Sequence, residues 1–202
     1  MFIKIIFAIS IMCINVLFAV DNTFDYKTEI KSAAIQVNQE ILIDRHIIVN
    51  NLYSIEKEKY LKNKYGISNL KNMKQVFSRV NTINLDLLLA QVELESNYGK
   101  SRFALEANNY LGIWTYDKNK KGLVPSKRTE GLTHKVQQFN TIYDCVYRYA
   151  ELLNSTKPYS AYRLIRVKTE DPYLLAKGLQ RYSADKKYID KIHHLLKKLQ
   201  TS

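Results

Sequence analysis

The sequence predicts a mainly α-helical domain of the α+β class that carries one small β-hairpin lobe. Apolar residues recur at helical spacing over most of the chain, whereas residues 112–139 hold short alternating runs and turn residues instead. Only three prolines and six glycines occur in 202 residues, and no repeat or low-complexity stretch interrupts the pattern. We therefore expect one compact helical unit with a local β-structure near its middle.

Residues 1–20 have the pattern of a secretory signal peptide. Lys4 gives a basic start, residues 5–19 are mostly apolar, and Ala19 is a small residue of the kind found at cleavage sites. The apolar core is shorter than the about 20 residues that a spanning helix needs. We predict cleavage near residue 20 and a periplasmic or secreted protein without stable membrane insertion, with an uncleaved anchor as the alternative.

The helices follow from apolar periodicity, one after another. We expect them at about residues 26–64, which one break would divide, and then at about 70–79, 84–96, 101–107, 142–154, 171–182 and 185–200. Asn84 is suited to cap the third of these, and Asp144 stands three residues after Thr141 as in a capping box. The last helix places its leucines and isoleucines on one stripe, with lysines opposite.

The β-lobe is expected within residues 112–139. Residues 114–116 read as a first short strand, residues 117–122 as a polar turn, and residues 123–124 and 133–139 as further strands.

The net charge of +12, from 31 basic and 19 acidic residues, raises the question of an anionic partner. For an exported chain this would be the cell wall or a membrane surface, although scattered lysines are also typical of a solvated surface. No nucleic-acid-binding motif is present, so we expect no nucleic acid partner. The histidines lack metal-binding spacing, and Cys145 has a helical, core-like context. We predict no metal and no cofactor.

Glu95 is the strongest candidate for a catalytic group. It ends the mostly apolar run 84–95, and Gly99 follows as a left-handed stop. The negative end of the helix dipole and apolar neighbours both raise the pKa of a carboxyl in that place, toward the value that a general acid needs near neutral pH. A solvated glutamate at a helix end is the alternative. Glu93, two residues earlier, is expected on the surface.

The block around Glu95 resembles the signature of the glucosaminidase family of peptidoglycan hydrolases, which includes flagellar rod-cap muramidases, autolysins and the Bax-like proteins of Gram-negative bacteria. The matching positions are Ala90, Gln91, Leu94, Glu95, Ser96, Tyr98, Gly99, Ser101, Phe103, Ala104, Asn108, Asn109, Leu111, Gly112 and Ile113. Weaker similarity continues through residues 122–125, 153–154, 162–166 and 175–188, and it covers nearly all of the chain after residue 20.

The resemblance implies a lysozyme-like domain over residues 81–202, with residues 21–80 as a helical extension packed on it. Glycan strands would lie in the cleft between the helices and the β-lobe. The implied activity is hydrolysis of the β-1,4 bond at N-acetylglucosamine, with Glu95 as general acid and a monomer as the working form. A lytic transglycosylase or muramidase acting on the same glycan, and a wall-binding protein that does not cut, are the alternatives.

Glycoside hydrolysis usually takes two carboxylates. Related glucosaminidases are thought to take the second from the β-hairpin, where this chain offers Asp117 and Glu130, and we prefer Glu130. Some Bax-like sequences carry an acid where His134 stands here, so assistance by the 2-acetamido group of the substrate is an alternative to a second acid.

Four further residues are candidates for substrate binding. Trp114 or Tyr110 would form the floor of the glycan groove, because aromatic rings stack on the C–H faces of sugars. Asn109 would hold an acetamido group, and Tyr182 would reach the site with its hydroxyl. The alternatives are core packing for the two aromatic residues and ordinary turn chemistry for Asn109.

Overall fold

The computed structural model describes residues 24–126 and 131–201. The elements in this part of the chain are α1 (Tyr26–Val49), α2 (Ile55–Tyr65), α3 (Met73–Arg79), α4 (Leu85–Glu95), α5 (Arg102–Ala107), β1 (Trp114–Thr115), β2 (Gly122–Leu123), β3 (Lys135–Gln137), α6 (Ile142–Ser155), α7 (Ser160–Arg166), α8 (Pro172–Ala176) and α9 (Tyr188–Leu199), with 3-10 turns at Lys157–Tyr159 and Lys177–Leu179. The mainly helical, lysozyme-like fold with a small β-lobe is thus confirmed.

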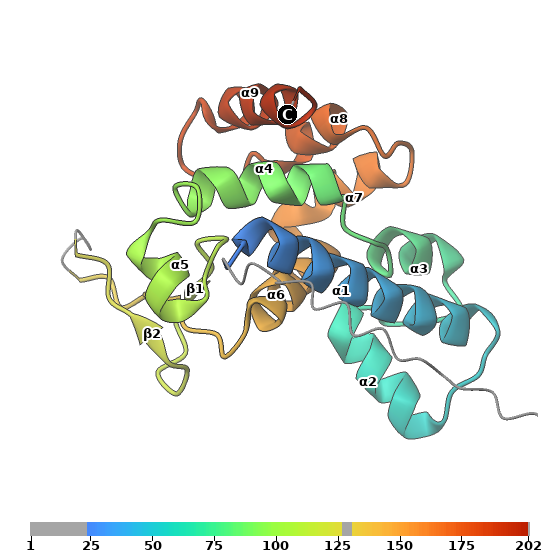
Figure 1. Ribbon diagram of the computed structural model, residues 1–202. Coiled ribbons are helices and arrows are strands. Elements are labelled where there is room, and N and C mark those ends of the chain that lie inside the picture. Colours follow the sequence, from blue (N-terminus) through green and yellow to red (C-terminus); the bar gives the residue numbers. More distant parts are fainter. Residues whose placement is uncertain (1–23, 127–130, 202) are drawn as a thin grey trace, which may run out of the picture.

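The helices surround α4. In Figure 1, α8 and α9 lie above α4, while α1 and α6 cross below it, and α2 extends to the far end. Buried side chains from α1, α4, α6 and α9 form one hydrophobic core that includes Val37, Leu88, Val146 and Ile192. Because α4 is packed on both sides, its apolar residues are buried almost all round, as the sequence predicts for this run.

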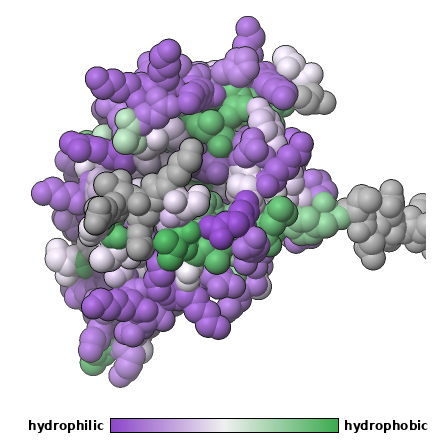
Figure 2. Space-filling model, turned by 90° about the vertical axis from the view of Figure 1, so that its left-hand side faces the viewer, coloured by the Kyte–Doolittle hydropathy of each residue, from purple (hydrophilic) through white to green (hydrophobic). Residues whose placement is uncertain are grey.

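The β-lobe projects beside α5 at the left of Figure 1. Strand β3 lies in the middle of the sheet and is antiparallel to both neighbours, with Trp114 opposite Val136 and Gly122 opposite Gln137. Figure 2 shows the face of the molecule that carries this lobe, which is mainly hydrophilic with hydrophobic patches near its middle.

Most expected helices are confirmed, including the one break expected within residues 26–64, and one needs correction. Residues 26–64 are divided after Val49, where Asn51 takes a left-handed φ of 53°. The helix expected over 171–182 ends at Ala176 and continues as a 3-10 turn. Helix α7 was not expected. It is a seven-residue helix without a side-chain N-cap, and it depends on contacts made by Arg163 and Arg166 rather than on local sequence signals.

The expected export segment, residues 1–20, lies outside the described residues. Within the described part of the chain, no helix has the length and apolar content needed to cross a membrane.

Candidate active site

The end of α4 presents Glu95 at a sharp reversal of the chain. The Asn84 side chain caps the start of the helix by accepting from the Leu87 N–H at 2.9 Å. At the other end, the Ser96 hydroxyl donates to the Val92 carbonyl at 2.6 Å and accepts from the Gly99 N–H at 2.7 Å. Residues 97, 98 and 99 all have left-handed φ values, of 50°, 57° and 75°. Ser96 therefore ties the last helical turn to the reversal that follows.

Glu95 opens into a cavity of about 770 Å³ between the helical core and the β-lobe. Its walls come from the end of α4, from β1 and the loop before it, from α6 and the 3-10 turn that follows, and from the loop before α9. The lining residues are Glu95, Leu111, Gly112, Ile113, Trp114, Leu152, Tyr159, Gln180, Arg181, Tyr182, Ser183 and Ala184. A cavity of this size accommodates sugar units, and the structure brings Trp114 and Tyr182 to the same cavity as Glu95.

Burial raises the pKa of Glu95 to about 7, and a hydrogen bond from Tyr188 acts in the opposite direction. The direction of the shift is the one expected from the sequence. A carboxyl with this pKa is protonated in a large fraction of molecules at neutral pH. Such a group can act as a general acid near pH 7.

Tyr188 is held against Glu95 by a chain of buried hydrogen bonds. The Tyr149 hydroxyl donates to the Gln91 side-chain oxygen, and the Gln91 amide nitrogen donates to the Tyr188 hydroxyl oxygen at 2.8 Å. Because the Tyr188 oxygen accepts from Gln91, its own proton is left to donate toward Glu95, which agrees with the lowering effect of Tyr188 on the pKa of that carboxyl. These buried hydrogen bonds orient the Tyr188 hydroxyl toward Glu95.

Replacing Tyr188 with phenylalanine is expected to move the alkaline limb of the kcat/KM profile to higher pH. The hydrogen bond favours the charged form of Glu95, so its loss raises the pKa of the acid, by roughly half a unit to one unit for a bond of about 1 kcal/mol. Glycan hydrolysis measured against pH checks this shift. Tyr173→Phe is the control, since its hydroxyl donates to Gln200 at the surface and Tyr173 does not line the cavity. A limb that stays in place or moves to lower pH would contradict this role.

Gly112 lies next to the Glu95 carboxyl and has no side chain to cover it. Its φ is +61°, and a Cβ atom at this position would stand 3.1 Å from Glu95 Oε2. The absence of a side chain at Gly112 therefore leaves the space next to Glu95 Oε2 free.

Substituting Gly112 with alanine is expected to lower kcat/KM by about tenfold or more, because the methyl group would occupy the approach to Oε2 and misplace the substrate. The matched control is Gly131→Ala. Gly131 also has a positive φ, of +82°, but a Cβ there meets nothing within 4 Å. Equal losses of activity in both variants would mean that backbone strain causes the loss, and not the methyl group next to the Glu95 carboxyl.

Trp114 lies on the cavity wall as a half-exposed ring. Its side chain is 53% exposed, and it stacks on His134 with ring centroids 4.0 Å apart and planes 14° apart. His134, which immediately precedes β3, supports one face of the indole, so the ring is held in a fixed plane. An indole that is exposed on one side and fixed on the other can stack on a flat apolar face of a ligand.

Tyr182 lines the cavity with its ring, while its hydroxyl donates to the Leu111 carbonyl at 2.8 Å and so fixes the loop before β1. Asn109 and Tyr110 are placed differently from expectation. Asn109 is 1% exposed, and its amide bonds the Ile113 and Gln137 backbone, which joins the turn to β3. Tyr110 is 2% exposed and stacks on Tyr26. Neither lines the cavity, because both sit in the core beneath it.

Among the described lining residues, Glu95 is the one carboxyl. Glu130, the preferred second acid, lies outside the described residues. Asp117 is exposed in the turn after β1, where it accepts from the Asn119 N–H at 2.9 Å, and it does not line the cavity. The expectation for Glu93 was wrong: it is 4% exposed, and α1 supplies its partners.

The functional role of Tyr188 was missed by sequence reasoning, although the residue belongs to the C-terminal element that carries the resemblance. Tyr188 and Glu95 are 93 residues apart in sequence, so no local pattern connects them. The polar Gln91 within the otherwise apolar run of α4 was the one sign in the sequence that this helix has a polar partner, which is Tyr188 on α9. Tyr159, also missed, lines the cavity, and burial raises its pKa to about 12.

Comparison with family models matches residues 70–201 to the glucosaminidase family, described as mannosyl-glycoprotein endo-β-N-acetylglucosaminidase. Every residue that lines the cavity falls within the matched segment. Comparisons with curated proteins and with solved structures gave no match.

Proposed function

The chain belongs to the glucosaminidase family of glycoside hydrolases, and we propose that it cleaves the β-1,4 bond after N-acetylglucosamine in peptidoglycan, with Glu95 as general acid. The observation that carries this proposal is the carboxyl of Glu95 itself. It is partly buried at the wall of a cavity large enough for sugars, its pKa is raised to about 7, and Gly112 leaves one of its oxygens accessible.

In the proposed reaction, Glu95 donates its proton to the glycosidic oxygen while the bond from that oxygen to C1 breaks. Positive charge then develops on C1 and the ring oxygen of the N-acetylglucosamine unit. Water attacks C1 to complete hydrolysis, and its released proton returns the acid to its starting state. The Tyr188 hydroxyl donates to the Glu95 carboxylate that forms in between, which stabilises the charged form.

Two routes deliver the attacking water. In one, Glu130 acts as general base. In the other, the 2-acetamido oxygen of the substrate first bonds to C1, and water opens the resulting ring. Glu130→Gln distinguishes them: a loss of activity as large as that of a Glu95 variant supports the base, and near-normal activity supports the substrate-assisted route.

Trp114 is proposed to hold a sugar ring next to the scissile bond. Its plane is fixed by His134 and its exposed side faces the cavity that Glu95 also lines. Peptidoglycan strands are the proposed partner of this groove, and the monomer is the proposed working form.

We place the protein in the periplasm or outside the cell, because residues 1–20 have the pattern of an export signal and the net charge of +12 suits an anionic wall. Cell fractionation and the mass of the mature chain test this placement. A full-length chain in the cytoplasm would contradict it.

Digestion of purified peptidoglycan with residues 21–202 tests the reaction. After borohydride reduction, mass spectrometry of the fragments should show reduced N-acetylglucosamine ends. Reduced N-acetylmuramic acid ends would identify a muramidase instead, and 1,6-anhydro-muramyl ends a lytic transglycosylase. Binding to the wall without any new ends would support the non-catalytic alternative.

A further inference from the structure

The first turn of α1 contacts the end of α4, although α1 lies outside the segment that the family model matches, which begins at residue 70. Asp25 caps α1 by accepting from the N–H groups of Lys27 and Thr28 at 3.0 and 3.2 Å. The cap fixes where the helix begins and so the positions of Tyr26 and Lys27 in its first turn. In Figure 1 the start of α1 lies beneath the end of α4 from which the chain turns toward α5.

Glu93 joins the two helices. It is 4% exposed, and both of its partners come from α1: the Tyr26 hydroxyl donates to Glu93 Oε1 at 3.0 Å, and Lys27 Nζ lies 2.6 Å from the same oxygen. A buried carboxylate is tolerated only where charge and hydrogen bonds compensate its lost hydration. Glu93 therefore holds α1 and α4 in one relative position, two residues before Glu95.

The Tyr26 ring covers the reversal that follows Glu95. A Cβ atom on Gly99 would stand 2.7 and 2.8 Å from two ring carbons, so the ring lies directly on the backbone at this position. On the other side, the ring stacks on Tyr110, with centroids 5.8 Å apart and planes 14° apart. Asn97 and Tyr98 take left-handed φ values there, a conformation that costs about 1–2 kcal/mol per residue and persists only where the surroundings impose it.

We propose that Tyr26, with Lys27 and Glu93, forms a brace that fixes the position of Glu95 and makes the start of α1 part of the catalytic unit. The inference rests on the proposed function of Glu95. Tyr26 is a positioning residue, because it touches Glu93 and Gly99 and does not itself line the cavity. Loss of the ring would free the 97–99 turn, let water reach the Glu95 carboxyl and move it relative to Gly112.

Tyr26→Ala is expected to lower kcat by about tenfold or more while KM changes less than about twofold, since small misplacements of a catalytic group are costly. Tyr26→Phe keeps the ring over Gly99 and should recover most of that loss. The matched control is Ile48→Ala, at the far end of the same helix, where the side chain is 1% exposed and does not touch the turn. All variants are assayed at a temperature at which circular dichroism shows them folded.

A readout without substrate keeps the brace testable apart from the reaction. The Glu95 carboxyl is followed by NMR titration, with the missing signal of Glu95→Gln as its assignment. In Tyr26→Ala its pKa should fall toward the ordinary glutamate value, whereas Ile48→Ala should leave it unchanged. An unchanged titration in Tyr26→Ala overturns the brace whether or not the wild type cleaves peptidoglycan. Should Tyr26→Ala fail to fold, the same titration on Lys27→Met with Glu93→Gln decides, and no shift there also overturns it.

Discussion

Replacing Glu95 with glutamine is expected to lower glycan hydrolysis by roughly 10²–10⁴-fold, the usual contribution of a positioned general acid. Glutamine has nearly the same shape, so the cavity and Trp114 remain and substrate binding should change little. The release of reducing ends from peptidoglycan measures the loss. Glu106→Gln is the matched control, because Glu106 lies on α5, is 57% exposed and does not line the cavity. A control that loses activity to the same extent would contradict the assignment.

The same variant should be more stable than the wild type in alkaline solution. The pKa of Glu95 rises on folding from 4.5 to about 7, so the folded state binds this proton more tightly than the unfolded chain does. The stability that this group contributes is present below pH 4.5 and is lost as pH rises through about 7. Glutamine does not titrate. The gain above pH 7 is at most about 3 kcal/mol, and urea unfolding at pH 5 and pH 8 measures it.

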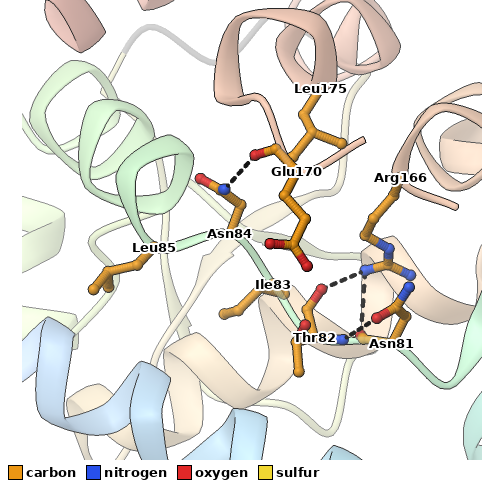
Figure 3. A pocket seen from close by; sticks show the side chains of 8 residues that line it. All are labelled: Asn81, Thr82, Ile83, Asn84, Leu85, Arg166, Glu170 and Leu175. Atoms are coloured by element: carbon orange, nitrogen blue, oxygen red, sulfur yellow. Dashed lines mark hydrogen bonds between the residues drawn. The ribbon is translucent and has the colours of Figure 1, made fainter. Parts of the chain in front are cut away.

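Arg166→Ala is expected to lower the free energy of unfolding by about 3 kcal/mol or more, from hydrogen bonds of a charged group and the carbonyls left unpaired. Arg166 is 6% exposed on α7. It donates to the Ser78, Asn81 and Thr82 carbonyls at 3.0, 3.3 and 3.0 Å and to Asn154 Oδ1 at 2.6 Å. Figure 3 shows the guanidinium directed at residues 81 and 82, which lead into α4.

Urea unfolding measures this loss, with Arg102→Ala as control. Arg102 is 48% exposed, and its contacts with Glu106 and with the Val124 carbonyl lie at the surface, so its removal should cost much less than the removal of Arg166. Similar losses in both variants would contradict a structural role for Arg166. Arg166 holds the segment that leads into the Asn84 cap of α4. Its loss is therefore also expected to reduce activity, to the extent that the start of α4 becomes less well fixed.

The fold could be predicted where local signals are strong. The apolar periodicity of α4 and α9, the Asn84 cap and the Thr141–Asp144 capping box all agree with the structure. Helix α7 could not be predicted, because it is stabilised by hydrogen bonds from its arginines to backbone carbonyls elsewhere in the chain. The 3-10 turn after Ala176 was read as helix, since a 3-10 turn has almost the same local pattern.

In the candidate site, too, features set by local sequence could be predicted, and features set by distant residues could not. The placement of Glu95 and the direction of its pKa follow from a helix end and apolar neighbours, both of which are local. Glu93 could not be placed, since it is buried by Tyr26 and Lys27 from a helix 67 residues earlier in the chain. Asn109 and Tyr110 belong to the same motif as Glu95, but the motif identifies residues that build the turn as well as residues that face the cavity.

The central claim is that Glu95 keeps its proton in a large fraction of molecules at neutral pH, because burial raises its pKa to about 7, and that this proton drives cleavage. The most direct test is the NMR titration of its carboxyl, compared with the pH dependence of kcat/KM on peptidoglycan. We predict a pKa of about 7 and an alkaline limb of kcat/KM that follows the same titration. A Glu95 carboxyl that titrates near the ordinary glutamate value of about 4.3, with activity that persists well above it, would contradict the claim.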